Sequence, residues 1–373
     1  MWRAMVTPLA SIIGSGFLVL GPILDHEYGV YAIVVMLFLC VAAFGFGSAI
    51  RFNLANRVEA ATPSLFMERA EVFASWALAI AYVISVAYYL NLFGAFSVKL
   101  TPADDPSSAK LVTTAAFTVI MAVGWSRGFK SLERMEYVSV SAKLAIIAGL
   151  LVGLAGYFYA QTSSGVFLIN PPTISGWPAV TLAFGLIITV QGFETSRYLT
   201  DAYEPKVCIA SMMRAQLLAT GIYLLYIALV SFVFERGDIA ISETAIIGIM
   251  EIVAPILPAL LIVAALAAQF SAAVADTSGS GGLVEELTAK RVSAASCYLV
   301  LSAIGIALTW WADVFQLINY ASRAFAIYYT IQSVIATSNA WRSGNAPRVV
   351  VYSALTLLGV LIVFTGTAVE GHN

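Results

Sequence analysis

The chain has 373 residues, of which 60% are hydrophobic and only 11% are charged, and its net charge is −2. Soluble domains carry about a quarter of their residues as charges, so this composition excludes a single water-soluble core. It predicts helices that face lipid as well as one another. The near-neutral balance gives no basic field of the kind that attracts nucleic acid, so no nucleic-acid partner is expected.

Apolar segments long enough to cross a bilayer follow one another along the chain. A span needs about 20 mostly apolar residues. This window predicts eleven spans, at 4–24, 29–50, 72–98, 109–126, 136–160, 177–200, 211–234, 256–284, 293–311, 314–338 and 347–367. The first segment has no small-residue cleavage site after it, so it is interpreted as a span and not as a signal peptide. The apolar stretch 242–253 is too short to cross and predicts a helix within a loop.

The basic residues predict how these spans are oriented. With the N-terminus in the cytoplasm, Lys99, Lys110 and Arg236 are the only basic residues in outside loops. The inside loops then hold Arg51, Arg57, Arg127, Lys130, Arg134, Lys206, Arg214, Lys290, Arg291, Arg342 and Arg348. This bias follows the positive-inside rule. We therefore expect a multi-pass protein of the plasma or inner membrane with its C-terminus outside.

Two of the predicted spans are interrupted by polar residues and glycines. The first contains the string Ser11-Ile12-Ile13-Gly14-Ser15-Gly16-Phe17, and the sixth contains Thr189-Val190-Gln191-Gly192-Phe193-Glu194-Thr195-Ser196. Backbone unwinds inside a membrane only where protein or water satisfies its polar groups. Exposed amides at a half-helix suit an anion and exposed carbonyls suit a cation. The alternative is that the glycines only permit close helix packing.

The two interruptions occupy matching places in the chain. Each lies in the first helix of a group of five, with one group over 1–160 and the other over 170–338, and the segment 347–367 adds one more helix. Broken helices at corresponding positions of two halves indicate an inverted-repeat transporter. The expected fold is therefore an all-α integral membrane protein with a single transmembrane domain over 1–373.

Four strings, in the right order, resemble the amino acid–polyamine–organocation (APC) superfamily, whose members share the LeuT-type fold. They are Ile13-Gly14-Ser15-Gly16; Gly128-Phe129-Lys130 leading to Ser141-Ala142-Lys143-Leu144; Gly192-Phe193-Glu194 followed by Ala202-Tyr203-Glu204-Pro205-Lys206; and Phe315-Gln316-Leu317-Ile318-Asn319-Tyr320. The resemblance implies a substrate site at Ile13, Gly14, Ser15, Gly16, Gln191, Gly192, Phe193 and Glu194. Eleven spans where twelve are common, and Asp276 in the eighth helix, depart from the family pattern.

Ionisable groups inside spans are the candidates for coupling, because they are costly in a bilayer. Lys143 lies in the fifth helix, and the resemblance implies that a lysine there carries a proton near the first break. A snorkelling lysine is the alternative. Ser271 and Asp276 in the eighth helix offer oxygen ligands, so sodium is kept as a second coupling ion. Arg323, at the equivalent place in the tenth helix, is expected to pair with Asp276 or Glu194.

The leading hypothesis is a secondary active transporter, a permease or symporter for an amino acid or related amine, coupled to protons and working by alternating access. The alternative is a cation channel or ion carrier that uses Glu194, Asp276 and Ser271. An enzyme is not expected, because the chain has no Ser-His pair and its three cysteines, Cys40, Cys208 and Cys297, have no metal-ligand spacing. No cofactor or metal is predicted. The sequence leaves the substrate, the direction of transport and the oligomeric state open.

Overall fold

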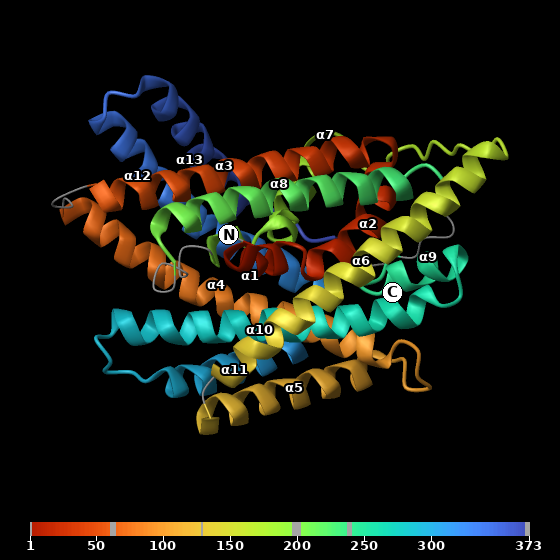
Figure 1. Ribbon diagram of the computed structural model, residues 1–373, viewed down its shortest axis with the longest axis horizontal. Coiled ribbons are helices and arrows are strands. Elements are labelled where there is room, and N and C mark those ends of the chain that lie inside the picture. Colours follow the sequence, from red (N-terminus) through yellow and green to blue (C-terminus); the bar gives the residue numbers. More distant parts are fainter. Residues whose placement is uncertain (1, 60–64, 128–129, 196–202, 237–240, 370–373) are drawn as a thin grey trace.

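The computed structural model describes residues 2–59, 65–127, 130–195, 203–236 and 241–369, and over these ranges its regular elements are all helices (Figure 1). In chain order they are α1 (Trp2–Ile12), α2 (Ser15–Tyr28), η1 (Gly29–Tyr31), α3 (Ala32–Glu59), α4 (Leu65–Val98), α5 (Pro106–Arg127), α6 (Lys130–Ser163), α7 (Gly176–Gly185), η2 (Ile187–Val190), α8 (Pro205–Val230), α9 (Ala245–Val253), α10 (Leu257–Leu287), α11 (Ala294–Trp311), α12 (Val314–Arg342) and α13 (Ala346–Thr365).

The predicted apolar segments correspond to these helices, with ends that shift by a few residues. Segment 4–24 becomes the pair α1 and α2, and segment 177–200 becomes α7 and η2 as far as it is described. The predicted loop helix at 242–253 is α9. Several helices run past the apolar window, because polar residues at their ends continue the same helical ladder.

Eight helices of the described chain are long and apolar enough to cross a membrane, counting Gly16–Asn56 as one. The helices α1, α7, α12 and the loop helix α9 fall outside that criterion. The first two are short because they are halves of broken helices, and α12 carries polar side chains throughout its length. The structure therefore supports an all-helical membrane protein, and the count of eleven spans stays a prediction.

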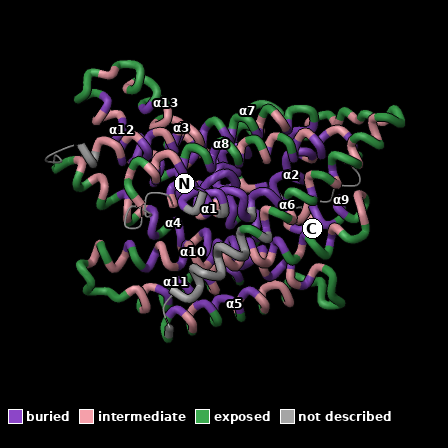
Figure 2. Tube along the Cα trace, in the orientation of Figure 1, coloured by how far each residue is buried: buried purple, intermediate pink, exposed green. Residues whose placement is uncertain are grey.

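The two halves of the first broken helix, α1 and α2, lie in the middle of the molecule. In Figure 1, α1 and α2 lie between α3 and α8 on one side and α4 and α10 on the other, and α1 packs against α8. The helices α5 and α11 form an outer layer beside α4, and α13 packs along α12. Figure 2 shows the buried residues concentrated around α1, α2 and α8, with exposed residues at the periphery. Cys40 and Cys208 are buried, whereas Cys297 is half-buried.

Local sequence explains where several helices start. Asp313 caps α12 by accepting the Gln316 backbone N–H, while the Gln316 side chain accepts the Asp313 N–H, which is a capping box. Asp105 precedes α5 and accepts hydrogen bonds from Ser108, and these bonds hold the pKa of Asp105 below its ordinary value of 3.8. Pro205 starts α8, where its missing N–H is no loss.

Polar contacts tie the central helices to their surroundings at both ends. At the end of α2, Thr173 donates its hydroxyl to Glu27 Oε2 at 2.7 Å and its backbone N–H to the Glu27 carbonyl at 3.0 Å. At the opposite end, in α3, Asn53 donates to the Gln332 side chain at 2.9 Å and accepts from Asn339 at 3.1 Å. The centre of the molecule is thus enclosed between two hydrogen-bonded ends.

Candidate functional site

The first break lies at Ile13 and Gly14, as predicted. Helix α1 ends at Ile12, Gly14 has φ −91° and ψ −129°, and α2 begins at Ser15. Gly14 is therefore outside the helical region, which interrupts the backbone ladder. Ile13 is fully buried beside this turn. The Ser15 side chain lies outside the described part of the structure.

The second break begins where α7 ends at Gly185. A single turn of 3₁₀ helix follows, and then Gln191 is extended and Gly192 has φ +115°. A residue without a Cβ adopts this positive φ without a steric clash, which explains why glycine occupies position 192. Ser322 of α12 stabilises the interruption, because its hydroxyl donates to the Gly185 carbonyl at 2.7 Å and accepts the Ile188 N–H at 3.0 Å. The predicted unwinding is confirmed up to Thr195, and Ser196 lies outside the described residues.

The two breaks pack directly on each other through their glycines. A Cβ placed on Gly16 would overlap the backbone carbonyl of Thr189, and a Cβ placed on Gly192 would overlap Ser11. Each break therefore uses a glycine to admit the backbone or side chain of the other. The sequence proposed either unwinding or close packing at these glycines, and the structure combines both.

Tyr223 of α8 joins the two breaks. Its hydroxyl lies 2.9 Å from the carbonyl oxygen of Ile12, at the end of α1, and 2.8 Å from that of Thr189. The hydroxyl thus offers one donor to two carbonyls that the broken helices leave without an intrahelical partner. Beside it, a cavity of about 10 Å³ touches Ile12 and Val190. That is roughly the space of one water molecule.

Glu194 lies immediately after the second break and is almost fully buried. Its Oε2 atom accepts the Gly192 N–H at 3.1 Å and the Tyr329 hydroxyl at 3.0 Å. Its Oε1 atom has no donor among the described residues. Phe193 stacks on the Tyr329 ring at 5.3 Å, and Phe46 of α3 stacks on the same ring at 5.1 Å. The carboxylate therefore has one oxygen held in place and one available.

Helix α4 supplies a further side of the site. The side-chain N–H of Gln191 donates to the Tyr89 hydroxyl at 3.0 Å. The side-chain oxygen Oε1 of Gln191 has no partner among the described residues. Asp276 of α10 is buried and accepts the Ser85 hydroxyl. Ser85 and Tyr89 are four residues apart on one face of α4, so Asp276 lies on the same side of α4 as the Gln191 contact. Two buried carboxyl groups and a tyrosine thus lie next to the break.

The two remaining coupling candidates lie on α6 and α10. Lys143 is buried on α6, where its neighbour Leu144 packs against Val6 of α1. Ser271 donates its hydroxyl to the Ala268 carbonyl of its own helix at 3.1 Å.

The expected pairing of Arg323 with Asp276 or Glu194 is wrong. Its Nε atom donates to the Val363 carbonyl of α13 at 2.6 Å. The ion pairs among the described residues are His26 with Glu27 and Lys99 with Asp104, so neither buried carboxylate of the site has a basic partner there. Adjacent residues on a helix are about 100° apart around the axis. Ser322 faces the break, so Arg323 points to α13.

The structure therefore brings together Gly16, Gln191, Gly192, Phe193, Glu194 and Asp276. Four further residues hold these groups in place and were not predicted from the sequence: Ser85, Tyr223, Ser322 and Tyr329. A signal for two of them exists, because Ser322 and Tyr329 are seven residues apart and so share one face of α12.

Comparison with known proteins identifies the family. The sequence model of the family described as APC superfamily transporter matches residues 1–366. An uncharacterized protein of Aquifex aeolicus (strain VF5) is 37% identical over 377 residues, which cover 99% of this chain and 92% of the relative. The chain belongs to the APC superfamily of transporters, as the sequence motifs indicated. It is thus a multi-pass membrane protein of a transporter family.

Proposed function

We propose that this protein is a secondary active transporter for an amino acid or a related amine, and that the substrate binds where the two helix breaks meet. The observation that carries the proposal is the junction itself. Two unwound segments from distant parts of the chain face each other at Gly16 and Gly192, beside the buried carboxyl groups of Glu194 and Asp276. Unwound backbone of this kind is tolerated in a bilayer where it lines a binding site.

The free polar atoms at the junction suit an amine-bearing substrate. Glu194 Oε1 and Gln191 Oε1 are buried acceptors without donors among the described residues. An ammonium group has three N–H donors and no acceptor, so it would satisfy both atoms. The backbone amides at the start of α2, after Gly14, would take a carboxylate group.

The proposed topology is eleven spans built as two inverted five-helix repeats and one additional helix, α13, with the N-terminus in the cytoplasm of a plasma or inner membrane. The contacts of the two fifth helices support it. In the second half α12 contacts its own half's break through Ser322, and in the first half α6 contacts α1 next to Lys143. Each half then pairs a broken helix with its fifth helix.

Coupling to protons is the mechanism that we propose, with Lys143 as the carrier and Asp276 as a second candidate. Both side chains are buried in the helical bundle. A buried ionisable group favours its neutral form, so protonation and opening of its surroundings are linked. Alternating access would then separate the two breaks on one side of the membrane at a time.

Uptake by purified protein in liposomes tests the proposal. A panel of labelled amino acids and amines is presented with and without an inward proton gradient, and with and without sodium. We expect saturable uptake of one chemical class, faster with the proton gradient, and loss of that acceleration in Lys143→Ala while exchange of substrate across the membrane continues. Uptake that ignores the gradient in the unmodified protein would refute proton coupling, and sodium dependence would replace it.

The same liposomes distinguish a transporter from a cation channel or ion carrier. A transporter moves labelled substrate against an equal internal concentration when a gradient is imposed. A channel lets cations through in the absence of any amino acid or amine. Cation flux without substrate, abolished by Asp276→Asn, would favour the channel.

A further inference from the structure

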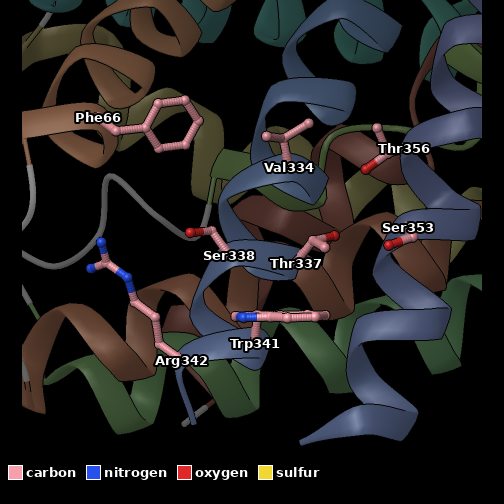
Figure 3. A pocket seen from close by; sticks show the side chains of 8 residues that line it. All are labelled: Phe66, Val334, Thr337, Ser338, Trp341, Arg342, Ser353 and Thr356. Atoms are coloured by element: carbon pink, nitrogen blue, oxygen red, sulfur yellow. The ribbon is translucent and has the colours of Figure 1, made fainter. Parts of the chain in front are cut away.

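A cleft lies far from the helix breaks, between the last turns of α12, the first turns of α13 and the start of α4. Its volume is about 440 Å³, and it is open to the surroundings. Eight side chains line it, and Figure 3 shows Phe66 on α4 facing Val334, Ser338 and Arg342 on α12, with Ser353 across from Trp341. The family site described above includes none of these residues.

The polar groups of the cleft are four hydroxyl groups, the Trp341 indole N–H and the Arg342 guanidinium, and no carboxylate is among the lining residues. The hydroxyls of Thr337 and Thr356 already donate to backbone carbonyls of their own helices, so Arg342, Trp341 and the two serines remain as donors. Arg342 donates only to the sulfur of Met67, at 3.7 Å, among the described residues. Glu68 is exposed on α4, but it follows Phe66 by two residues and so lies about 200° around the helix axis from it. Its carboxylate is therefore on the side of α4 that faces away from the cleft. The cleft therefore attracts an anion.

The surface in and around the cleft is apolar and exposed. Leu65 and Phe66 on α4 are 74% and 56% exposed, Trp341 is 75% exposed, and Val350 on α13 is 70% exposed. Exposed aromatic side chains are typical of the boundary between hydrocarbon and headgroups. Arg342 ends α12 and α13 starts four residues later, so the cationic end of the cleft lies at that boundary.

We propose that this cleft binds one anionic phospholipid, with its phosphate on Arg342 and the Ser338 hydroxyl and an acyl chain along Phe66, Val334 and Trp341. Basic pockets between membrane helices hold acidic headgroups in this way. The lipid bridges α4 and α12. Deeper along the same two helices, Gln332 donates to Glu71 at 3.4 Å, so the lipid braces a contact that already joins them.

Thermal unfolding of the delipidated protein in detergent tests the proposal without any transport assay. The protein is titrated with phosphatidylglycerol, phosphatidylcholine or inorganic phosphate, and the concentration for half-maximal stabilisation is measured. We expect phosphatidylglycerol to act at about five-fold lower concentration than phosphatidylcholine, the ratio that one arginine near the surface provides. Inorganic phosphate should have little effect, because it lacks the acyl chain.

Two arginine variants separate a site from diffuse surface charge. Arg342→Gln should remove the preference for phosphatidylglycerol, and Arg342→Lys should keep most of it. Arg348→Gln is the matched control at the same end of the molecule, because Arg348 stacks on Phe52 at 4.7 Å and does not line the cleft. Equal losses in Arg342→Gln and Arg348→Gln would overturn the proposal, since the charge would then act from anywhere on the surface.

A third variant tests the apolar part of the cleft. Ser353→Trp fills the space between α12 and α13 and should weaken stabilisation by both lipids. Arg342 and Ser353 lie at the lipid-facing surface, so these variants leave the core intact. Stabilisation by inorganic phosphate as strong as that by phosphatidylglycerol would instead identify a site for a free anion and overturn the lipid proposal.

Discussion

Gly16 has no side chain, and the backbone of Thr189 fills the position that a Cβ atom would occupy. Gly16→Ala would push the two breaks apart. Because the neighbour is backbone and cannot rotate away, we expect a loss of about 1–3 kcal/mol of stability, as overpacked sites show. Uptake should fall steeply in the same variant, because the proposed site lies between these segments. Thermal unfolding and liposome uptake measure the two effects.

Gly149→Ala is the matched control for that substitution. A Cβ at Gly149 on α6 meets no atom within 4 Å. Alanine is a better helix former than glycine, so this variant should be as stable as the unmodified protein or slightly more stable. If Gly16→Ala also leaves stability and uptake unchanged, the two breaks are not in contact in solution.

The hydroxyl of Tyr223 carries the second prediction at this scale. Tyr223→Phe keeps the ring and removes the donor shared by the Ile12 and Thr189 carbonyls. Leaving buried acceptors unsatisfied costs about 1–3 kcal/mol, so the apparent melting temperature should fall. Tyr226→Phe is one turn further along α8 and removes a hydroxyl that has no partner among the described residues. That variant should be neutral, and an equal loss in both would contradict the bridging role.

Among the elements, α12 determines how well the second break is supported. Ser322→Ala removes both the donor to Gly185 and the acceptor for the Ile188 N–H. We expect a loss of about 1–3 kcal/mol from unsatisfied backbone groups and a lower uptake rate, because η2 would lose its fixed position. Ser333→Ala, on the same helix, removes a buried hydroxyl without a partner among the described residues and should have little effect. Unfolding midpoints of the two variants provide the comparison.

The helices themselves were predictable, and the contacts between them were not. Long apolar runs determine where α3 and α10 lie, and Gly14 and Gly192 marked the breaks because glycine and polar groups interrupt such runs. Which side chains of two helices meet depends on the rotation of each helix about its axis, and the sequence does not give that rotation. Arg323 and Ser322 are adjacent on α12, yet Arg323 contacts Val363 while Ser322 contacts the second break.

The part of the site that consists of residues adjacent in the sequence was predictable. Gln191 through Glu194 form one such string, and the family resemblance located it. Tyr223 and Ser85 were missed, because a tyrosine or serine in an apolar helix is typical of ordinary packing until its partner is known. Those partners are carbonyl groups and a carboxylate on helices distant in sequence.

At the scale of the whole molecule, both ends of the central helices are held by hydrogen bonds. The Thr173 contacts with Glu27 enclose one end, and the contacts of Asn53 with Gln332 and Asn339 enclose the other. Each set consists of neutral or single-charge hydrogen bonds, worth about 0.5–3 kcal/mol apiece. Energies of this size would let a substrate shift the balance between the two ends, as the proposed alternating access requires.

The chain segment after α13 adds a connection between the additional helix and the second break. Thr367 donates its N–H to the Thr181 carbonyl of α7 at 3.0 Å, its carbonyl occupies the space beside Gly185, and Val369 is 6% exposed. A chain that ends at Thr365 loses these contacts. Burial of a valine contributes about 1.5–3 kcal/mol and the hydrogen bond about 1 kcal/mol, so the melting temperature should fall by several degrees.

The position of this segment gives the truncation a second consequence. Gly185 is the residue at which α7 ends and the second break begins, and Ser322 holds its carbonyl from the other side. Without residues 366–369 the end of α7 is supported only by α12, so uptake should fall together with stability. A chain that ends at Val369 keeps every described contact and should behave like the full chain. If the chain ending at Thr365 is equally stable and active, the segment does not brace the break, and α12 alone determines the position of α7.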